Sequence, residues 1–188
     1  MSGDISSDRS EAVSAMLQAD HGGGVDEIAA AVIAGLVSRE WTVATAESIS
    51  GGALCAALTD VPGASRVVVG GVVSYATRIK AQLLDVETDL LTRHGAVDPD
   101  VALQMAQGVR DLLGVDCAVA TTGSAGPDPA PGGTDTDEVA PGRVFLAVIT
   151  PDASWAEQLD LRGDRAAIRA SSVRGALQAL DRTLRQAT

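Results

Sequence analysis

Aromatic side chains are scarce in this sequence, and this scarcity limits how a core can be built. The 188 residues include two Trp, one Tyr and one Phe, while hydrophobic residues of all kinds make up 46% of the chain. That fraction is enough for a substantial core, which Ala, Val, Leu and Ile must supply while many glycines allow close packing. The composition favours an α/β fold over an all-β sandwich.

Cysteine and histidine are also nearly absent, which excludes several kinds of site. Cys55 and Cys117 lie inside apolar runs, where buried and reduced thiols are expected. His21 and His94 are the only histidines, too few for a zinc site of the usual spacing. They also give no credible Ser-His-Asp triad, because only His94 lies outside the polar N-terminal region. We therefore expect no metal and no other cofactor.

Basic residues are outnumbered by acidic ones, and no long apolar run is present. The net charge of −11 disfavours binding to nucleic acid and to anionic membranes, because phosphates would be repelled. No apolar run approaches the roughly 20 residues of a membrane span. Residues 1–24 lack the basic start and the apolar core of a signal peptide. We expect a cytoplasmic protein with a flexible N-terminal leader at 1–24 and a single domain at 25–188.

The spacing of apolar residues predicts helices and strands in near alternation. Expected helices cover residues 25–39, 50–58, 79–84, 87–94, 99–113 and 164–185. Expected strands cover residues 41–46, 67–75, 117–121, 143–150 and 155–161, of which 67–75 reads as a continuous, buried strand. This order predicts a three-layer α/β/α sandwich with a mostly parallel mixed sheet, whose last two strands form an antiparallel hairpin. A long loop at 124–142, rich in Pro, Gly and Asp, is either functional or disordered.

Lys80 is the single lysine of a chain that has thirteen arginines. Either residue can supply a surface charge, but only lysine can lose its proton when it is desolvated. Lys80 is therefore a candidate for a required amine, although one surviving surface lysine is an ordinary alternative. Tyr75, the only tyrosine, lies five residues earlier at the end of an apolar strand, where α/β sheets place their ligands. Its alternative role is that of a half-buried aromatic residue with a satisfied hydroxyl.

The segment A-E-S-I-S-G-G at 46–52 predicts the end of a strand, a tight turn and the start of a helix. That geometry exposes a side chain beside a helix N-terminus, whose free N–H groups can hold an oxyanion or a phosphate. Ser48 and Ser50 are the candidate nucleophiles, and helix capping by one serine is the plainer alternative. If Ser48 is activated, an amine must take its proton because no histidine is suitable, which leaves Lys80 as the base.

Two further segments are candidates for ligand binding. The small residues of T-G-S-A-G-P at 122–127 follow an expected strand and allow the backbone to approach a ligand closely, although a plain turn also explains them. Arg165 and Arg169 are four residues apart on one helix face and could bind phosphate. A solvated face or a subunit contact explains this pair equally well.

Taken together and in this order, five motifs resemble the CinA C-terminal domain family, also called PncC. The family pattern reads A-E-S-C-T-G-G, Y-x-N-x-x-K, H-G-A-V-S, T-G-I-A-G-P and G-D-R-x-x-I-R. The matching segments in this chain are 46–52, 75–80, 94–98, 122–127 and 163–169. The resemblance covers about residues 25–184.

The resemblance implies an amidohydrolase that deamidates nicotinamide mononucleotide to nicotinic acid mononucleotide and ammonia by a Ser-Lys mechanism without a metal. Ser48 would be the nucleophile, Lys80 the general base, and Tyr75 a proton relay or a residue that orients Lys80. The expected substrate-binding residues are Ser50, Gly51 and Gly52 near the oxyanion, Thr122, Gly123, Ser124 and Gly126 near the ribose phosphate, and Arg165. The resemblance also implies a homodimer or a larger homo-oligomer whose small-molecule partner is this nucleotide.

Departures from the family pattern keep a second hypothesis open. Ile49, Thr77 and Ser124 replace Cys, Asn and Ile of the pattern. They motivate a non-catalytic CinA-like relative, a nucleotide-binding or competence-associated protein that keeps the pocket without the activity. A short-chain dehydrogenase also uses Ser, Tyr and Lys, but it needs a separation of four between Tyr and Lys and a Gly-rich dinucleotide turn. The separation here is five, and no such turn follows the first strand.

Overall fold

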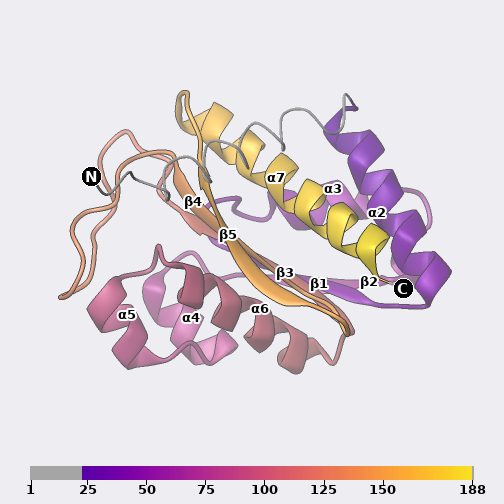
Figure 1. The fold of residues 1–188 in the computed structure, drawn as a ribbon, viewed down its shortest axis with the longest axis horizontal. Coiled ribbons are helices and arrows are strands. Elements are labelled where there is room, and N and C mark those ends of the chain that lie inside the picture. Colours follow the sequence, from indigo (N-terminus) through magenta and orange to yellow (C-terminus); the bar gives the residue numbers. More distant parts are fainter. Residues whose placement is uncertain (1–22, 188) are drawn as a thin grey trace, which may run out of the picture.

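Five strands form one mixed sheet in the structure, a computed structural model that describes residues 23–187. The strands are β1 (Val43–Glu47), β2 (Val68–Val73), β3 (Cys117–Gly123), β4 (Arg143–Ile149) and β5 (Ser154–Asp160). Their order across the sheet is β2-β1-β3-β4-β5 (Figure 1). The predicted leader lies outside the described residues, apart from its last two positions.

The direction of the strands corrects one detail of the prediction. β1 pairs in parallel with β2 and with β3, whereas β3 with β4 and β4 with β5 pair antiparallel. The expected mixed sheet and its final hairpin are confirmed, but "mostly parallel" is wrong because two of the four pairings are antiparallel. A parallel pairing needs a crossover, usually a helix, and neither the 124–142 loop nor the short β4–β5 turn supplies one.

β2 also differs from its expected environment. The run of valines predicts a strand buried on both faces, but β2 lies at the edge of the sheet and alternates half-buried with exposed positions. Val69 and Val73 are 52% and 49% exposed. Strand order, which a local run of residues does not encode, decides this exposure.

Helices cover both faces of the sheet and confirm the three-layer α/β/α sandwich (Figure 1). The helices are α2 (Val25–Arg39), α3 (Ala53–Thr59), α4 (Thr77–Leu84), α5 (Thr88–His94), α6 (Pro99–Leu113) and α7 (Arg165–Gln186), with a short 3₁₀ helix at Ala64–Arg66. One core joins α2, α3 and α7 to the sheet, and a second joins α4, α5 and α6 to the opposite face. Among residues 23–187, no helix combines the length and apolarity needed to cross a bilayer.

Helix α6 positions the second layer closely against the sheet. The strands present small side chains to it, including Ala44, Ala118 and Ala120, so α6 contacts all five strands. Its start is fixed by the Asp98 carboxylate, which accepts the N–H of Asp100 at 2.8 Å. α4 in turn packs on α6.

Candidate active site

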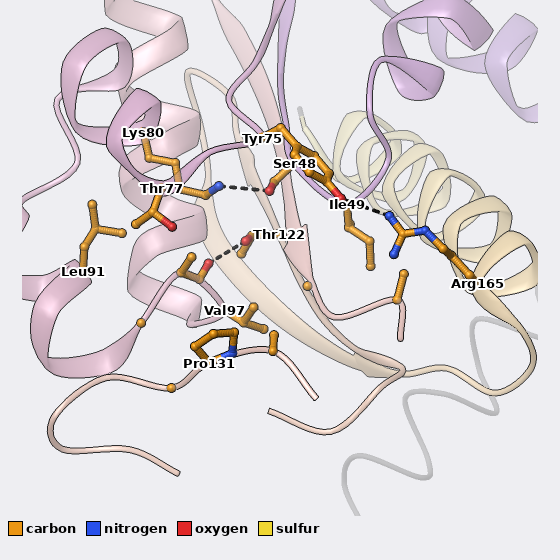
Figure 2. Close-up of a pocket in the computed structure, with 16 residues that line it drawn as sticks. Ser48, Ile49, Tyr75, Thr77, Lys80, Leu91, Val97, Thr122, Pro131 and Arg165 are labelled. Atoms are coloured by element: carbon orange, nitrogen blue, oxygen red, sulfur yellow. Dashed lines mark hydrogen bonds between the residues drawn. The ribbon is translucent and has the colours of Figure 1, made fainter. Parts of the chain in front are cut away.

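A cavity of about 440 Å³ opens where the segments that follow β1 and β3 meet α4 and α7. Small-molecule sites occupy roughly 300–1,000 Å³, so this volume suits a single small ligand. The lining comes from residues within 48–49, 75–80, 91–97, 122–125 and 130–132, together with Arg165 of α7. Figure 2 shows Ser48 between Lys80 on one side and Arg165 on the other.

Ser48 directly follows β1, and the backbone around it holds its hydroxyl at the cavity. Its N–H donates to the carbonyl oxygen of Thr121 at 2.9 Å, which continues the β1–β3 pairing beyond the strand. Gly51 and Gly52 then turn the chain into α3 with φ values of +64° and +95°. These values lie in the left-handed region, which favours glycine and explains the Gly-Gly pair.

Glu47, the last residue of β1, is fully buried and caps the helix that follows this turn. Its carboxylate accepts the N–H groups of Gly52, Leu54 and Cys55 at 2.8–3.0 Å. The hydroxyl of Thr45 donates to the same carboxylate at 3.0 Å. Because these amides are already bonded, the N-terminus of α3 is not the free anion site that the sequence suggested.

Arg169 of α7 holds the same turn from the other side. Its guanidinium donates to the carbonyl oxygens of Ile49 at 3.1 Å and Ser50 at 2.8 Å. The hydroxyl of Ser50 is bonded to that of Thr121 at 2.7 Å and is buried. Two charged side chains, Glu47 and Arg169, thus fix the backbone that follows Ser48 by charge-assisted hydrogen bonds.

Lys80 reaches the site from α4 and is 1% exposed. Its ammonium donates to Ser48 Oγ at 2.9 Å and to the carbonyl oxygen of Ser74 at 2.7 Å. Ser74 is itself held by β1, because its N–H donates to the carbonyl oxygen of Glu47 at 2.7 Å. The hydroxyl–amine pair is therefore aligned by backbone contacts at the ends of β1 and β2.

Burial changes the acidity of this amine. Desolvation lowers the pKa of Lys80 from 10.5 to about 8, because a charged ammonium is disfavoured away from water. None of the described residues that line the cavity is acidic, so no carboxylate there opposes the effect. An amine with this pKa has an appreciable neutral fraction near pH 7–8 and can accept a proton.

Tyr75 and Arg165 form the opposite side of the cavity. Tyr75 is 64% exposed, and its hydroxyl accepts a hydrogen bond from Arg165 Nη2 at 3.0 Å. Arg165 Nη1 donates to the carbonyl oxygen of Gly126 at 3.1 Å. The Tyr75 hydroxyl thus contacts Arg165, and the group that holds Lys80 in place is the carbonyl of Ser74.

The residues expected to bind substrate divide into two groups. Those at the cavity are Thr122, Gly123 and Arg165. Those outside its lining are Ser50, Gly51, Gly52, Ser124 and Gly126. Ser124 extends the β3–β4 pairing through its backbone, donating to the carbonyl oxygen of Arg143 at 2.9 Å. Ser124 and Gly126 therefore support the site through their backbone, whereas Thr122 and Gly123 line the cavity.

Several lining residues were not assigned from the sequence. Residues 95–97, between α5 and α6, and residues 130–132, in the long loop, both face the cavity. The first lie in the H-G-A-V segment, which carried a family motif but no assigned role. The length of the 124–142 loop was the signal that could have indicated residues 130–132. Nothing in the sequence pattern indicated the Ser74 carbonyl, because any residue supplies one.

The assembled groups suit an anionic small molecule with an electrophilic carbon. A hydroxyl beside a buried amine can be deprotonated and attack that carbon. Lys80 and Arg165 are the charged residues among the described lining, and both are cationic. An arginine at one end of the cavity can bind a phosphate or carboxylate group with good geometry.

Known proteins resemble this chain along nearly its whole described length. The family model of the CinA C-terminal domain matches residues 25–184. A CinA-like protein of Parasynechococcus marenigrum is 45% identical over 87% of this chain, which spans 38% of that relative. A CinA superfamily protein of Klebsiella pneumoniae has a TM-score of 0.80 and 32% identity, with 88% of this chain and all of that chain covered.

A third comparison agrees with these two. The competence/damage inducible protein CihA of Agrobacterium tumefaciens has a TM-score of 0.78 and 37% identity, covering 87% of this chain and 97% of its own. The chain spans little more than a third of the length of the curated relatives it matches. With the family model matched from the start of α2 into the last turn of α7, the chain belongs to the CinA C-terminal domain family.

Proposed function

We propose that this protein is an amidohydrolase that deamidates nicotinamide mononucleotide by a Ser-Lys mechanism. The observation that carries the proposal is the hydrogen bond of 2.9 Å between the buried amine of Lys80 and Ser48 Oγ. A neutral amine at that distance can take the hydroxyl proton directly. Membership of the CinA C-terminal domain family supports the same activity.

The reaction begins with attack on the carboxamide. Neutral Lys80 accepts the proton of Ser48, and Oγ forms a bond to the carboxamide carbon, whose oxygen becomes an oxyanion. The N–H of Gly52 is already bonded to Glu47 and is not free to stabilise the oxyanion. The oxyanion donor is therefore proposed closer to Ser48 along the chain. Ile49 lines the cavity and directly follows Ser48, the position whose N–H stabilises the oxyanion in nucleophile elbows.

Two further steps complete the reaction cycle. Protonated Lys80 returns its proton to the amide nitrogen, the carbon–nitrogen bond breaks, and ammonia leaves an acyl group on Ser48. Water then attacks this ester while Lys80 accepts its proton. The bond between the acyl carbon and Ser48 Oγ breaks, and Lys80 returns the proton to Oγ, which releases nicotinic acid mononucleotide and free Ser48. Splitting the reaction into two steps lowers the barrier presented by a poorly electrophilic amide.

The charge of the cavity supports a phosphorylated substrate. Arg165 is the proposed phosphate ligand, because it lies across the cavity from Lys80 and offers a planar guanidinium (Figure 2). Thr122 and Gly123 lie between these ends and are proposed to contact the ribose. Tyr75 is proposed to position Arg165, to which its hydroxyl is bonded.

A non-catalytic, nucleotide-binding protein is the second candidate. Ile49 and Thr77 both line the cavity, and both differ from the family pattern. A changed lining can hold a nucleotide with its carboxamide away from Ser48, so that the molecule binds without reacting. This candidate predicts that the nucleotide binds without turnover, whereas the amidase predicts both binding and turnover.

The test is ammonia release from nicotinamide mononucleotide by the intact protein and by Ser48→Ala and Lys80→Met. Arg78→Ala is the matched control, because Arg78 is a cation of the same helix whose contact is with exposed Gln82. We expect turnover in the intact protein and in Arg78→Ala, and none in the other two. Binding of the nucleotide by calorimetry without any ammonia release would reject the amidase and favour the second candidate.

A further inference from the structure

The long loop between β3 and β4 folds back to form one wall of the cavity. Residues 130–132 of this loop line the cavity, although the loop is far from Ser48 and Lys80 in sequence. Ala130 and Val139 form a β-bridge with backbone hydrogen bonds of 2.9 and 2.8 Å, which closes the loop on itself. Val139 is buried in the core beneath α5 and α6, so this closure is anchored.

The tip of the loop is docked on the last turn of α5. The N–H groups of Thr134 and Asp135 donate to the carbonyl oxygens of Thr92 at 2.9 Å and Arg93 at 2.8 Å. The hydroxyl of Thr136 donates to the carbonyl oxygen of His94 at 3.0 Å. These carbonyls have no partner inside the helix, so the loop satisfies groups that the helix end leaves free.

Two consecutive glycines allow this docking. A Cβ added to Gly133 would overlap the carbonyl of Arg93, and one added to Gly132 would overlap the carbonyl of Asp137. Both obstacles are backbone atoms, which cannot move aside like the end of a side chain. The P-G-G segment at 131–133 is therefore shaped to its place against α5.

The wall is apolar although the loop that carries it is acidic. Ala130 and Pro131 face the cavity with Leu91 and Val97, while Asp135 and Asp137 of the same loop are exposed. In Figure 2, Pro131, Val97 and Leu91 lie on the side of the cavity away from Arg165. The cavity thus has an apolar part, which suits the face of a flat ring, and a cationic part.

We propose that residues 130–132 are a specificity-determining wall, with Pro131 packing on the heteroaromatic ring of the substrate while its phosphate lies at Arg165. The proposal rests on the proposed function, because it assumes a ring-bearing carboxamide nucleotide. It assigns no chemical step to the loop. The wall selects the ring by apolar contact.

The experiment compares two prolines of the same loop. Pro131→Ala removes the proposed ring contact, and Pro129→Ala is the matched control because Pro129 is also exposed but does not line the cavity. Affinities are measured by calorimetry for nicotinic acid mononucleotide and for ribose 5-phosphate, which lacks the ring. We expect Pro131→Ala to weaken binding of the ring-bearing nucleotide about fivefold and to leave ribose 5-phosphate unchanged. Pro129→Ala should change neither.

A second variant tests the docking itself. Gly133→Ala should displace the wall and weaken nucleotide binding at least as much as Pro131→Ala, with faster proteolysis of the loop. With nicotinamide mononucleotide as substrate, both variants should raise KM and keep kcat within about twofold, since neither residue contacts Ser48 or Lys80.

The outcomes separate the two proposals. If the intact protein hydrolyses the nucleotide, but Pro131→Ala behaves like Pro129→Ala, the wall is rejected and the function stands. Equal weakening for both ligands in Pro131→Ala also rejects ring selection. If the intact protein neither binds nor hydrolyses the nucleotide, the proposed function fails and the wall fails with it.

Discussion

At the scale of single residues, the burial of Lys80 suits its proposed role as a base but disfavours its charged form. The amine is buried among groups that accept its hydrogen bonds but carry no negative charge, namely Ser48 Oγ and the carbonyl of Ser74. Hydrogen bonding keeps it in place, while missing hydration makes its charged form unfavourable. The pKa of about 8 is the result of this balance.

The pH dependence of activity should follow from that pKa. Only neutral Lys80 can accept the proton of Ser48, so kcat/KM should rise with pH and level off above about 8. At pH 7 roughly one tenth of the molecules would hold the neutral amine. Initial rates of ammonia release between pH 6 and 9.5 check this, and a profile that is flat or falls across pH 7–8 would argue against Lys80 as the base.

The same burial should lower stability in a defined pH range. The pKa of Lys80 is 10.5 when unperturbed and about 8 in the folded chain, so the unfolded state binds more protons between these values. Stability from this group is therefore least below pH 8 and increases as pH rises toward 10.5. Lys80→Met should raise the free energy of unfolding at pH 7 by about 1–3 kcal/mol, with a smaller gain near pH 10. Urea unfolding of both proteins at the two pH values measures this, and a destabilised Lys80→Met at pH 7 would contradict it.

Glu47 should prove to be a positioning residue. Each of its carboxylate oxygens accepts two hydrogen bonds. Glu47→Gln would therefore place an NH₂ group against N–H donors of the turn between Ser48 and α3. We expect destabilisation of about 2 kcal/mol or more and a fall in kcat of about tenfold or more, with KM little changed. Glu27→Gln, on the exposed side of α2, is the control. Loss of stability with unchanged kcat would limit Glu47 to a structural role.

At the scale of elements, the crossing of α4 and α6 decides where Lys80 lies. A Cβ added to Gly108 of α6 would overlap the backbone of Leu84 at the end of α4. Gly108→Ala should therefore push α4 away, with destabilisation of about 2 kcal/mol and a fall in kcat. Gly35→Ala is the control in α2, because its new Cβ would meet only the side-chain end of Leu184, at 3.3 Å. Unfolding curves and kcat for both variants test the idea, which requires Gly108→Ala to be the more damaging.

The helices and strands themselves were well predicted, whereas the position and direction of each strand in the sheet were predicted only for the final hairpin. Apolar spacing located the strands and most helices to within a few residues. The exposure of β2 could not be predicted, because an apolar run looks the same in a central strand and an edge strand. The antiparallel pairing of β3 with β4 makes the sheet less parallel than predicted, and it depends on the path of a loop without a helix.

The site shows the same division. The motifs and the single lysine predicted that Ser48 and Lys80 act together, and Ser48 Oγ lies 2.9 Å from Lys80 Nζ. The oxyanion donors placed at Gly52 could not be judged from sequence, because the Glu47 carboxylate occupies that amide only in three dimensions. The contact between Tyr75 and Arg165 joins residues 90 positions apart, which no local pattern encodes.

At the scale of the whole molecule, the site is a meeting point of both helical layers. Lys80 comes from α4 on one face of the sheet, and Arg165 comes from α7 on the other. The carboxyl ends of β1 and β3 lie between them and supply Ser48 and Thr122. A ligand that contacts both cations therefore bridges the two layers, so ligand binding should stabilise the domain as a unit.

The absence of acidic residues from the described lining has a consequence for the kinetics of encounter. An anionic ligand must approach through the repulsive field of a chain with a net charge of −11 before it reaches the cationic cavity. Raising the salt concentration from 10 to 150 mM shortens the screening length from roughly 30 to 8 Å and weakens that repulsion. The association rate constant for the nucleotide should therefore rise about two- to threefold with salt in stopped-flow measurements, the reverse of electrostatic steering. A rate that falls with salt would mean that the local field of Lys80 and Arg165 extends beyond the cavity mouth and captures the ligand at a distance.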